Sequence, residues 1–175
     1  MKTLISFFVT MMVMLVACNK DQFVQDEPLL LKKAKVAIPM KADFCFTPDL
    51  TLPPVHINGL PWTDPAYFLP GGGWMSGNAT HMGELIMEES ALTVLSASFD
   101  PNTGIVTWLA TGKATAANGD YYYYDATTYV NPDKSFTGPV KMRDGVGKFE
   151  GATGTVQMVG QGTCWHAEGT MSFEQ

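Results

Sequence analysis

The sequence is poor in the residues that metal sites and nucleic-acid-binding surfaces require. It holds 3 histidines and 3 cysteines in 175 residues, and its 11 basic residues are outnumbered by 17 acidic ones. His56, His81 and His166 show none of the close spacings of a metal motif, so we predict no metal ion and no other cofactor. A formal net charge of −6 without a basic patch argues against a nucleic-acid partner.

Motifs that would name an activity are also missing. The run Gly71-Gly72-Gly73 is not followed by the Lys-Ser/Thr pair of a phosphate-binding loop. A Gly-x-Ser-x-Gly nucleophile elbow does not occur either. The sequence therefore leaves open whether the protein is an enzyme, and it favours a non-catalytic role.

The one long apolar run lies at the start of the chain, from Leu4 to Val16, after the positively charged Lys2. It is shorter than the roughly 20 residues that span a bilayer, and it has the form of a secretory signal. It ends in Leu15-Val16-Ala17-Cys18, which resembles the lipobox of bacterial lipoproteins. That resemblance implies that Cys18 receives a diacylglycerol and a further acyl chain, such as palmitate. The alternative is an ordinary signal peptide beside an incidental cysteine.

These features predict a signal peptide over residues 1–17, a tether over 18–34 and one domain over 35–175. The lipid on Cys18 would make the membrane a partner of the chain. It would also place the protein in the bacterial cell envelope, at the outer membrane rather than the inner one.

Short β-rich runs separated by turn residues recur throughout the domain. They predict eight strands, at residues 35–46, 79–88, 91–99, 105–116, 120–130, 135–142, 154–160 and 163–173. The first and last of these alternate cleanly between apolar and polar residues, which is typical of antiparallel strands with one buried face. Serial hairpins favour an all-β fold, a closed antiparallel up-and-down barrel of about eight strands, which also leaves no exposed sheet edge.

Two connections stand out in this barrel. Asn118-Gly119 predicts a type I′ hairpin turn, which needs positive φ at both central residues. Residues 47–77, rich in proline and glycine, predict a long loop between the first two strands. The loop carries Trp62, Tyr67, Phe68 and Trp74. These rings form either a binding lid or an apolar staple that holds the loop against the end of the barrel.

Three segments of the domain form a recognisable series: Asn78-Ala79-Thr80-His81-Met82-Gly83, Ala116-Ala117-Asn118-Gly119-Asp120 and Gly145-Val146-Gly147-Lys148-Phe149-Glu150-Gly151-Ala152-Thr153-Gly154. Together they resemble the allene oxide cyclase-like barrel proteins, whose relatives include the plant dirigent proteins. The resemblance runs from about residue 72 to the C-terminus and implies a closed antiparallel barrel of eight strands. Phe149 is the one large apolar residue among the glycines of the third segment, so it can plug the barrel end. Val146 and Lys148 replace the usual threonine and arginine. No motif here carries the cyclase's catalytic residues.

Several side chains are candidates for a pocket inside such a barrel. Glu84 and Glu88 share one face of the second predicted strand and would be acid–base groups if that face were buried. The simpler reading leaves them in solvent. Tyr122 and Tyr124 lie on one face of their strand, where they form either part of a pocket wall or cross-strand packing. Trp108, on the neighbouring strand, has the same two alternatives. Trp62 and Trp74 would join the pocket if the loop formed a lid.

Cys45 and Cys164 lie on the polar faces of the first and last predicted strands. These strands become neighbours when the barrel closes, so the two cysteines form a disulfide if the register brings them opposite each other. Otherwise they remain two free thiols.

Two hypotheses about function follow. The first is a lipid-anchored binding or structural module, with a small apolar molecule as its possible ligand. The second, which rests on the family resemblance alone, is an isomerase, a cyclase or a dirigent-like guide for a small apolar substrate in the barrel cavity.

Overall fold

The computed structural model describes residues 36–172. The predicted signal peptide, Cys18 and the tether lie outside this range. Within it, the regular elements are β-strands and short 3₁₀ helices. No helix in the described range is long and apolar enough to cross a membrane.

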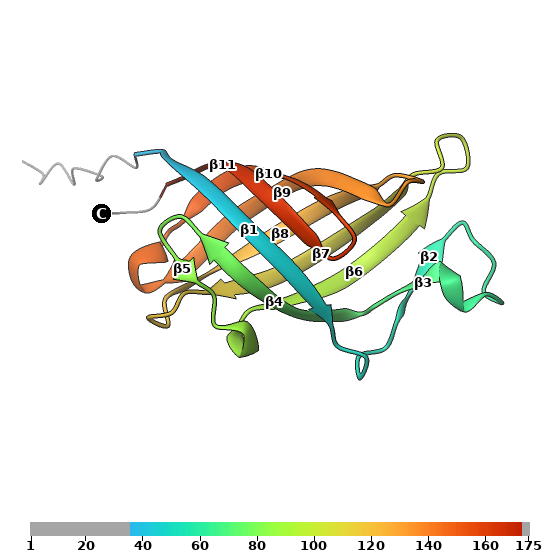
Figure 1. Ribbon diagram of the computed structural model, residues 1–175, viewed down its shortest axis with the longest axis horizontal. Helices are drawn as coiled ribbons and strands as arrows, with labels where there is room; N and C mark the ends of the chain where they lie inside the picture. The colour runs from blue at the N-terminus through green and yellow to red at the C-terminus, as the bar shows by residue number, and fades with distance from the viewer. Residues whose placement is uncertain (1–35, 173–175) are drawn as a thin grey trace, which may run out of the picture. The chain divides into compact units, whose positions relative to one another are not determined.

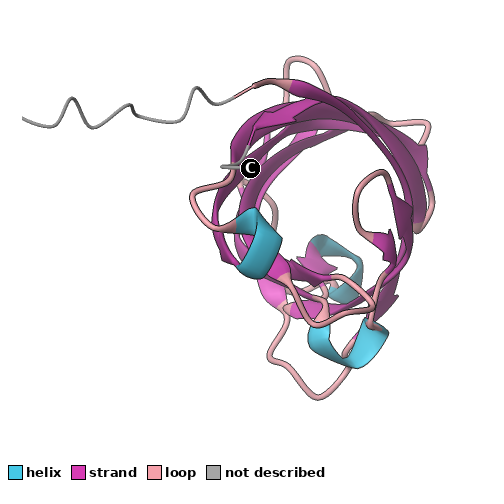
Figure 2. Cartoon of the chain, turned by 90° about the vertical axis from the view of Figure 1, so that its left-hand side faces the viewer, coloured by secondary structure: helices cyan, strands magenta, loops and turns pink. Residues whose placement is uncertain are grey.

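Eight strands form a closed ring, and each is antiparallel to the next along the chain (Figure 1). They are β1 (Ile38–Pro48), β4 (Gly72–Ala79), β6 (Ala91–Phe99), β7 (Val106–Thr115), β8 (Tyr121–Val130), β9 (Ser135–Val146), β10 (Thr153–Gln161) and β11 (Cys164–Ser172). Pairing of β11 with β1 and of β4 with β6 completes the ring. Figure 2 looks along the barrel and shows the strands encircling its interior. The predicted all-β, closed, antiparallel up-and-down barrel is confirmed.

Seven of the eight predicted strands match strands of the ring, but the second prediction is wrong. The second strand of the ring is β4, which ends at Ala79, where the predicted strand was to begin. Its glycines suggested a turn, yet they are needed because backbone crowds this strand. A Cβ atom at Gly73 would collide with the Thr47 carbonyl and the Phe46 ring.

The segment that follows β4 is a compact turn rather than a strand. His81 and Gly83 have positive φ, at 69° and 71°. The two-residue strand β5 (Gly83–Glu84) pairs back onto β4, and the 3₁₀ helix η2 (Met87–Glu89) then leads into β6. The reversal directs Met82 and Leu85 into the core, where they are 5% and 6% exposed.

The connection from β1 to β4 is more ordered than the predicted long loop. β2 (Val55–Asn58) pairs in parallel with the end of β6, and β3 (Phe68–Leu69) pairs with β2. Between them, the 3₁₀ helix η1 (Pro65–Tyr67) is capped by the side chain of Asp64, which accepts a hydrogen bond from the Ala66 amide at 2.8 Å. β2 and β3 are additional to the ring and lie near the end of β6 (Figure 1).

The β7–β8 hairpin has a different turn from the predicted type I′. Gly119 has a φ of 87°, whereas Asn118 is not among the residues with positive φ. The Gly119 amide donates to the Ala116 carbonyl, and the Ala116 amide donates to the Asp120 carbonyl, each at 2.8 Å. This is the pattern of a three-residue loop in which a type I turn is followed by a left-handed glycine.

One end of the barrel is closed by apolar side chains. Phe149, at the end of the 3₁₀ helix η3 (Gly147–Phe149), is 0% exposed, as is Ala152. Met40 and Met171 beside them are 1% exposed. Phe149 meets the ring of Tyr122 edge-on at 5.6 Å between centroids, so it fills the barrel end, as its place among the glycines of residues 145–154 predicted.

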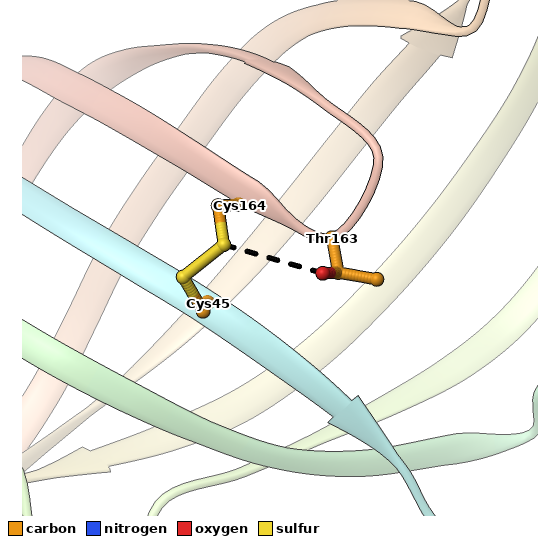
Figure 3. The surroundings of a disulfide bond; sticks show 3 residues. All are labelled: Cys45, Thr163 and Cys164. Carbon is orange, nitrogen blue, oxygen red and sulfur yellow. Dashed lines mark hydrogen bonds between the residues drawn. A yellow bond between two sulfur atoms is a disulfide. The ribbon is translucent and has the colours of Figure 1, made fainter.

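A disulfide joins β1 and β11 on the outer wall (Figure 3). Cys45 and Cys164 are direct partners in the register of the two strands. The bridge links residues 119 positions apart, and the Thr163 hydroxyl lies 4.0 Å from the Cys164 sulfur. Of the two possibilities that the sequence left open, the structure therefore contains the disulfide.

Candidate functional site: an apolar cavity inside the barrel

An apolar cavity of about 340 Å³ occupies the interior of the barrel. All eight strands of the ring contribute to its wall through their inward-facing side chains, which are mainly aliphatic, aromatic and methionine residues. This volume lies within the range of roughly 300–1,000 Å³ that is usual for small-molecule pockets. The cavity is therefore large enough for a small ligand.

The interior stays open because small residues occupy inward-facing positions of several strands. Ala114, Ala126 and Ala167 line the cavity at positions where a larger side chain would fill it. Most of the larger residues around them, such as Met75 and Met158, are nearly fully buried against neighbours. Methionine is flexible and polarisable, so a wall rich in it adapts to apolar ligands of different shape.

The cavity opens at one end of the barrel, which we call the mouth. The mouth is defined by Lys134, Gly162 and Thr163, which line the cavity and are exposed to solvent. Leu69 of β3 and Pro70, which follows it, line the cavity as well. The opposite end is the one filled by Phe149, so a ligand has access from the mouth.

Tyr122 and Tyr124 project into the cavity from the same face of β8 but differ in their hydrogen bonding. The Tyr124 hydroxyl lies 3.0 Å from the Met75 sulfur and 3.3 Å from the Ala91 carbonyl oxygen. Its ring lies over Gly112, where a Cβ atom would collide with the Tyr124 hydroxyl. Burial raises the pKa of both phenols well above the usual value, so both remain protonated donors.

Trp108 also lines the cavity, as the sequence suggested, from the part of β7 nearer the mouth. Its indole Nε1 is buried and has no hydrogen-bond partner among the described residues. Thr128, the register partner of Trp108 on β8, is 2% exposed and lines the same wall.

Four residues considered for a pocket do not line it. Glu84 is exposed on β5, because the chain turns after Ala79 instead of continuing as a strand, and Glu88 is exposed as well. Trp74 is not part of the cavity wall, whereas Met75, the next residue of β4, is. Trp62 is 72% exposed and stacks on His56, with 3.8 Å between ring centroids.

The rings of the β1–β4 connection thus pack mainly on one another. His56 and Trp62 both meet Phe68 edge-on, at 5.0 Å and 5.9 Å. Both ring nitrogens of His56 are buried without a hydrogen-bond partner among the described residues. This cluster belongs to the small β2–β3 unit, and none of its three rings lines the cavity.

Charged groups are nearly absent from the cavity wall. Among the described lining residues only Lys134, at the mouth, carries a charge, and no carboxylate or histidine is present. The described residues also contain no group of three or more metal-binding side chains. The wall can exclude water, bury hydrocarbon and donate hydrogen bonds, but it holds no pair of groups for acid–base chemistry.

Most titratable contacts lie on the outer wall. Between β1 and β11, His166 Nδ1 lies 2.9 Å from Asp43 and Nε2 lies 3.0 Å from Glu168, while Lys41 contacts Glu168 at 2.7 Å. Both imidazole nitrogens face carboxylates, which favours the doubly protonated ring. The hydrogen bond to Asp43, followed by that to Glu168, raises the pKa of His166.

Sequence reasoning missed most of the cavity wall because its residues are ordinary core residues. Phe44, Phe136, Val140 and Trp165 have nothing in their local sequence that distinguishes a pocket from a packed interior. Small residues at inward positions of neighbouring strands, such as Ala114 and Ala126, were the available signal.

No protein-family model, curated protein or solved structure matches the chain. The resemblance to allene oxide cyclase-like proteins therefore stays a prediction from the three motifs quoted above. The geometry of the cavity carries the functional argument.

Proposed function

We propose that this protein is a binding module that holds a small, largely apolar molecule inside its barrel. The supporting observation is the cavity of about 340 Å³, which has an almost entirely apolar wall and reaches solvent at Lys134, Gly162 and Thr163. Burial of apolar surface, worth about 25 cal/mol per Å², would provide the affinity. A purely structural barrel has no need of such a space, because a filled interior is more stable.

The proposal can be tested by filling the cavity. Ala126→Phe places a ring in the cavity wall, whereas Ala91→Phe places the same ring on an exposed strand position. We expect an environment-sensitive apolar dye to bind the wild type and Ala91→Phe alike, and to bind Ala126→Phe at least about tenfold more weakly. Circular dichroism establishes that each variant is folded. Unchanged dye affinity in folded Ala126→Phe would contradict the proposal.

Native mass spectrometry of protein purified from its own envelope provides a second test. A retained small molecule would appear as a mass increment that is lost on denaturation. Ala126→Phe should lack this increment, and Ala91→Phe should keep it.

An isomerase, cyclase or guide function is the second candidate, and one observation favours it. The Tyr122 hydroxyl belongs to an apolar wall, where it could orient a reactive intermediate by donating a hydrogen bond. The described part of the cavity wall contains no carboxylate or histidine to complete an acid–base pair. If the retained molecule is returned to ligand-free protein and converted to a new species, catalysis is supported, whereas unchanged recovery favours binding alone.

The proposal includes a lipid anchor at Cys18 in the bacterial envelope, at the outer membrane in preference to the inner one. The lipobox-like end of the apolar run supports it. The Cys45–Cys164 disulfide adds support, because such bonds persist outside the reducing cytoplasm. Cys18→Ser should abolish metabolic labelling with palmitate, whereas Cys164→Ser should retain it. Full labelling of Cys18→Ser would refute the anchor.

A further inference from the structure

The hydroxyl of Tyr122, like the Trp108 Nε1 nearer the mouth, is a polar group of the cavity wall that the described residues leave unpaired. Its neighbour on the same strand face, Tyr124, already contacts Met75 and the Ala91 carbonyl. Tyr122 is 3% exposed, and burial alone, without a contribution from any hydrogen bond, raises the pKa of its phenol. A buried hydroxyl without an acceptor destabilises the fold, so a ligand that supplies one is favoured.

The position of this hydroxyl is set by rigid packing. The Tyr122 ring meets Phe149, which is fully buried, and its register partners on the flanking strands are Ala114 and Gly145. Ala114 lines the cavity beside the phenol, whereas Gly145 is packed closely against Phe149, where a Cβ atom would collide with the Phe149 carbonyl. Tyr122 therefore lies at the deep end of the cavity, away from the mouth.

The hydroxyl also opens onto the cavity rather than into packed protein. In the described part of the chain, the unpaired side-chain polar atoms that are fully enclosed by protein are both ring nitrogens of His56 and the Trp108 Nε1. The unpaired Tyr122 oxygen is not one of them, so part of its surface is accessible. Since this oxygen has no protein partner and Tyr122 lines the cavity, a ligand atom can reach it. The raised pKa keeps the phenol protonated, so it acts as a donor.

The rest of the wall excludes a charged group at this depth. Lys134 is the one charged residue among the described lining residues, and it lies at the mouth. A carboxylate or ammonium group buried beside Tyr122 would lose its hydration without gaining an ion pair, which is strongly unfavourable.

We propose that the ligand is an uncharged, mostly hydrocarbon molecule with one oxygen acceptor, bound with that oxygen at the Tyr122 hydroxyl. The inference rests on the proposed function and specifies the ligand class and its orientation. A carbonyl or ether oxygen enters first and meets Tyr122, while the hydrocarbon part fills the wider cavity toward the mouth.

A matched pair of probes separates the hydrogen bond from apolar burial. Acetylnaphthalene and ethylnaphthalene have nearly the same shape, but only the ketone accepts a hydrogen bond. Their affinities would be measured by fluorescence for the wild type, Tyr122→Phe and Tyr123→Phe. Tyr123, on the outer face of β8, is 38% exposed and provides the control for loss of a tyrosine hydroxyl.

We expect Tyr122→Phe to weaken binding of the ketone by about two- to tenfold, the value of one net hydrogen bond. Ethylnaphthalene should bind Tyr122→Phe as well as it binds the wild type, and Tyr123→Phe should match the wild type with both probes. The ketone C=O stretch should shift to lower frequency in the wild type and return toward its unbonded value in Tyr122→Phe.

The other outcomes each overturn a defined part of the argument. Equal loss of both probes in Tyr122→Phe would show that the ring acts through shape, which overturns this inference and leaves the proposed function intact. If neither probe binds the wild type, the inference and the proposed function both fail. If naphthoic acid binds more tightly than the ketone and Lys134→Met removes that preference, the ligand is anionic and the inference is overturned.

Discussion

The two ends of the barrel have similar strands but opposite interiors. At the closed end, the connection after β4 directs Met82 and Leu85 inward, and the turn after β9 adds Phe149. At the mouth, the rings of Trp108 and Trp165 are only partly buried, although they also face the interior.

The turns account for this difference. Mouth turns hold short polar side chains that bond to their own backbone: Asp100 accepts from the Asn102 amide at 2.9 Å, and Asp133 accepts from the Ser135 amide at 2.9 Å. Such turns keep the chain at the rim and direct no apolar group inward. At the closed end the β7–β8 turn is of this polar kind too, since Asn118 accepts from the Asp120 amide at 3.2 Å, but the connections after β4 and β9 carry apolar residues that fold into the barrel. Turn chemistry therefore determines which end is filled and which end admits a ligand.

The disulfide is the largest expected contribution to stability, and it lies toward the mouth. Replacing both Cys45 and Cys164 by serine should lower the free energy of unfolding by about 4–5 kcal/mol in the chain-entropy model, because the closed loop is long. Urea unfolding of the oxidised and reduced wild type would measure it, and the reduced form should behave like the double variant. The denatured, unreduced mature protein should show no free thiol. Identical urea midpoints for oxidised and reduced protein would contradict the prediction.

Phe149 provides the next largest effect and a direct test of the contrast between the ends. Phe149→Ala should cost about 3–5 kcal/mol, because it leaves a cavity where the side chain was fully buried. Phe136→Ala, at the partly buried rim, should cost clearly less and should enlarge the ligand cavity. Thermal and urea unfolding measure both costs. Equal losses for the two variants would remove the proposed difference between the ends.

Glycines with positive φ occur at both ends of the barrel, so replacing them should cost a similar amount of stability at each end. These substitutions therefore test backbone strain independently of how the interior is filled. Gly119, at the closed end, and Gly162, at the mouth, have positive φ and no neighbouring atom where a Cβ would lie. Gly119→Ala and Gly162→Ala should each cost about 1–2 kcal/mol. Gly119→Asn should cost less than Gly119→Ala, since asparagine tolerates this conformation. An alanine variant with an unchanged melting temperature would show that its turn relaxes.

The smallest effect is electrostatic and lies on the outer wall, independent of either end. The pKa of His166 is raised by Asp43 and Glu168, so its contribution is complete below the unfolded histidine value of about 6.5 and is lost as pH rises through the raised folded value. The melting-temperature difference between the wild type and His166→Gln should therefore be larger at about pH 6 than at pH 9. A difference that does not change with pH would argue against a protonated His166.

The predictions that held rest on local patterns, and those that failed depended on distant chain segments. Apolar–polar alternation identified β1 and β11 with their buried faces, because neighbouring side chains of a strand point in opposite directions. β4 was missed, since its glycines accommodate backbone from other strands and look like turn residues in isolation. Glu84 was considered for a pocket only through that misplaced strand.

The amino-acid sequence alone determined the all-β class, most strands and the candidate Tyr122, Tyr124 and Trp108, because these follow from local periodicity. The tertiary structure decided the remainder. The disulfide needed the register that sets Cys45 opposite Cys164. The cavity needed closure of the ring, which brings small residues such as Ala114, Ala126 and Ala167 around one space. The contrast between Tyr122 and Tyr124 arises because the β4–β6 pairing that closes the barrel places acceptors near one hydroxyl and none near the other.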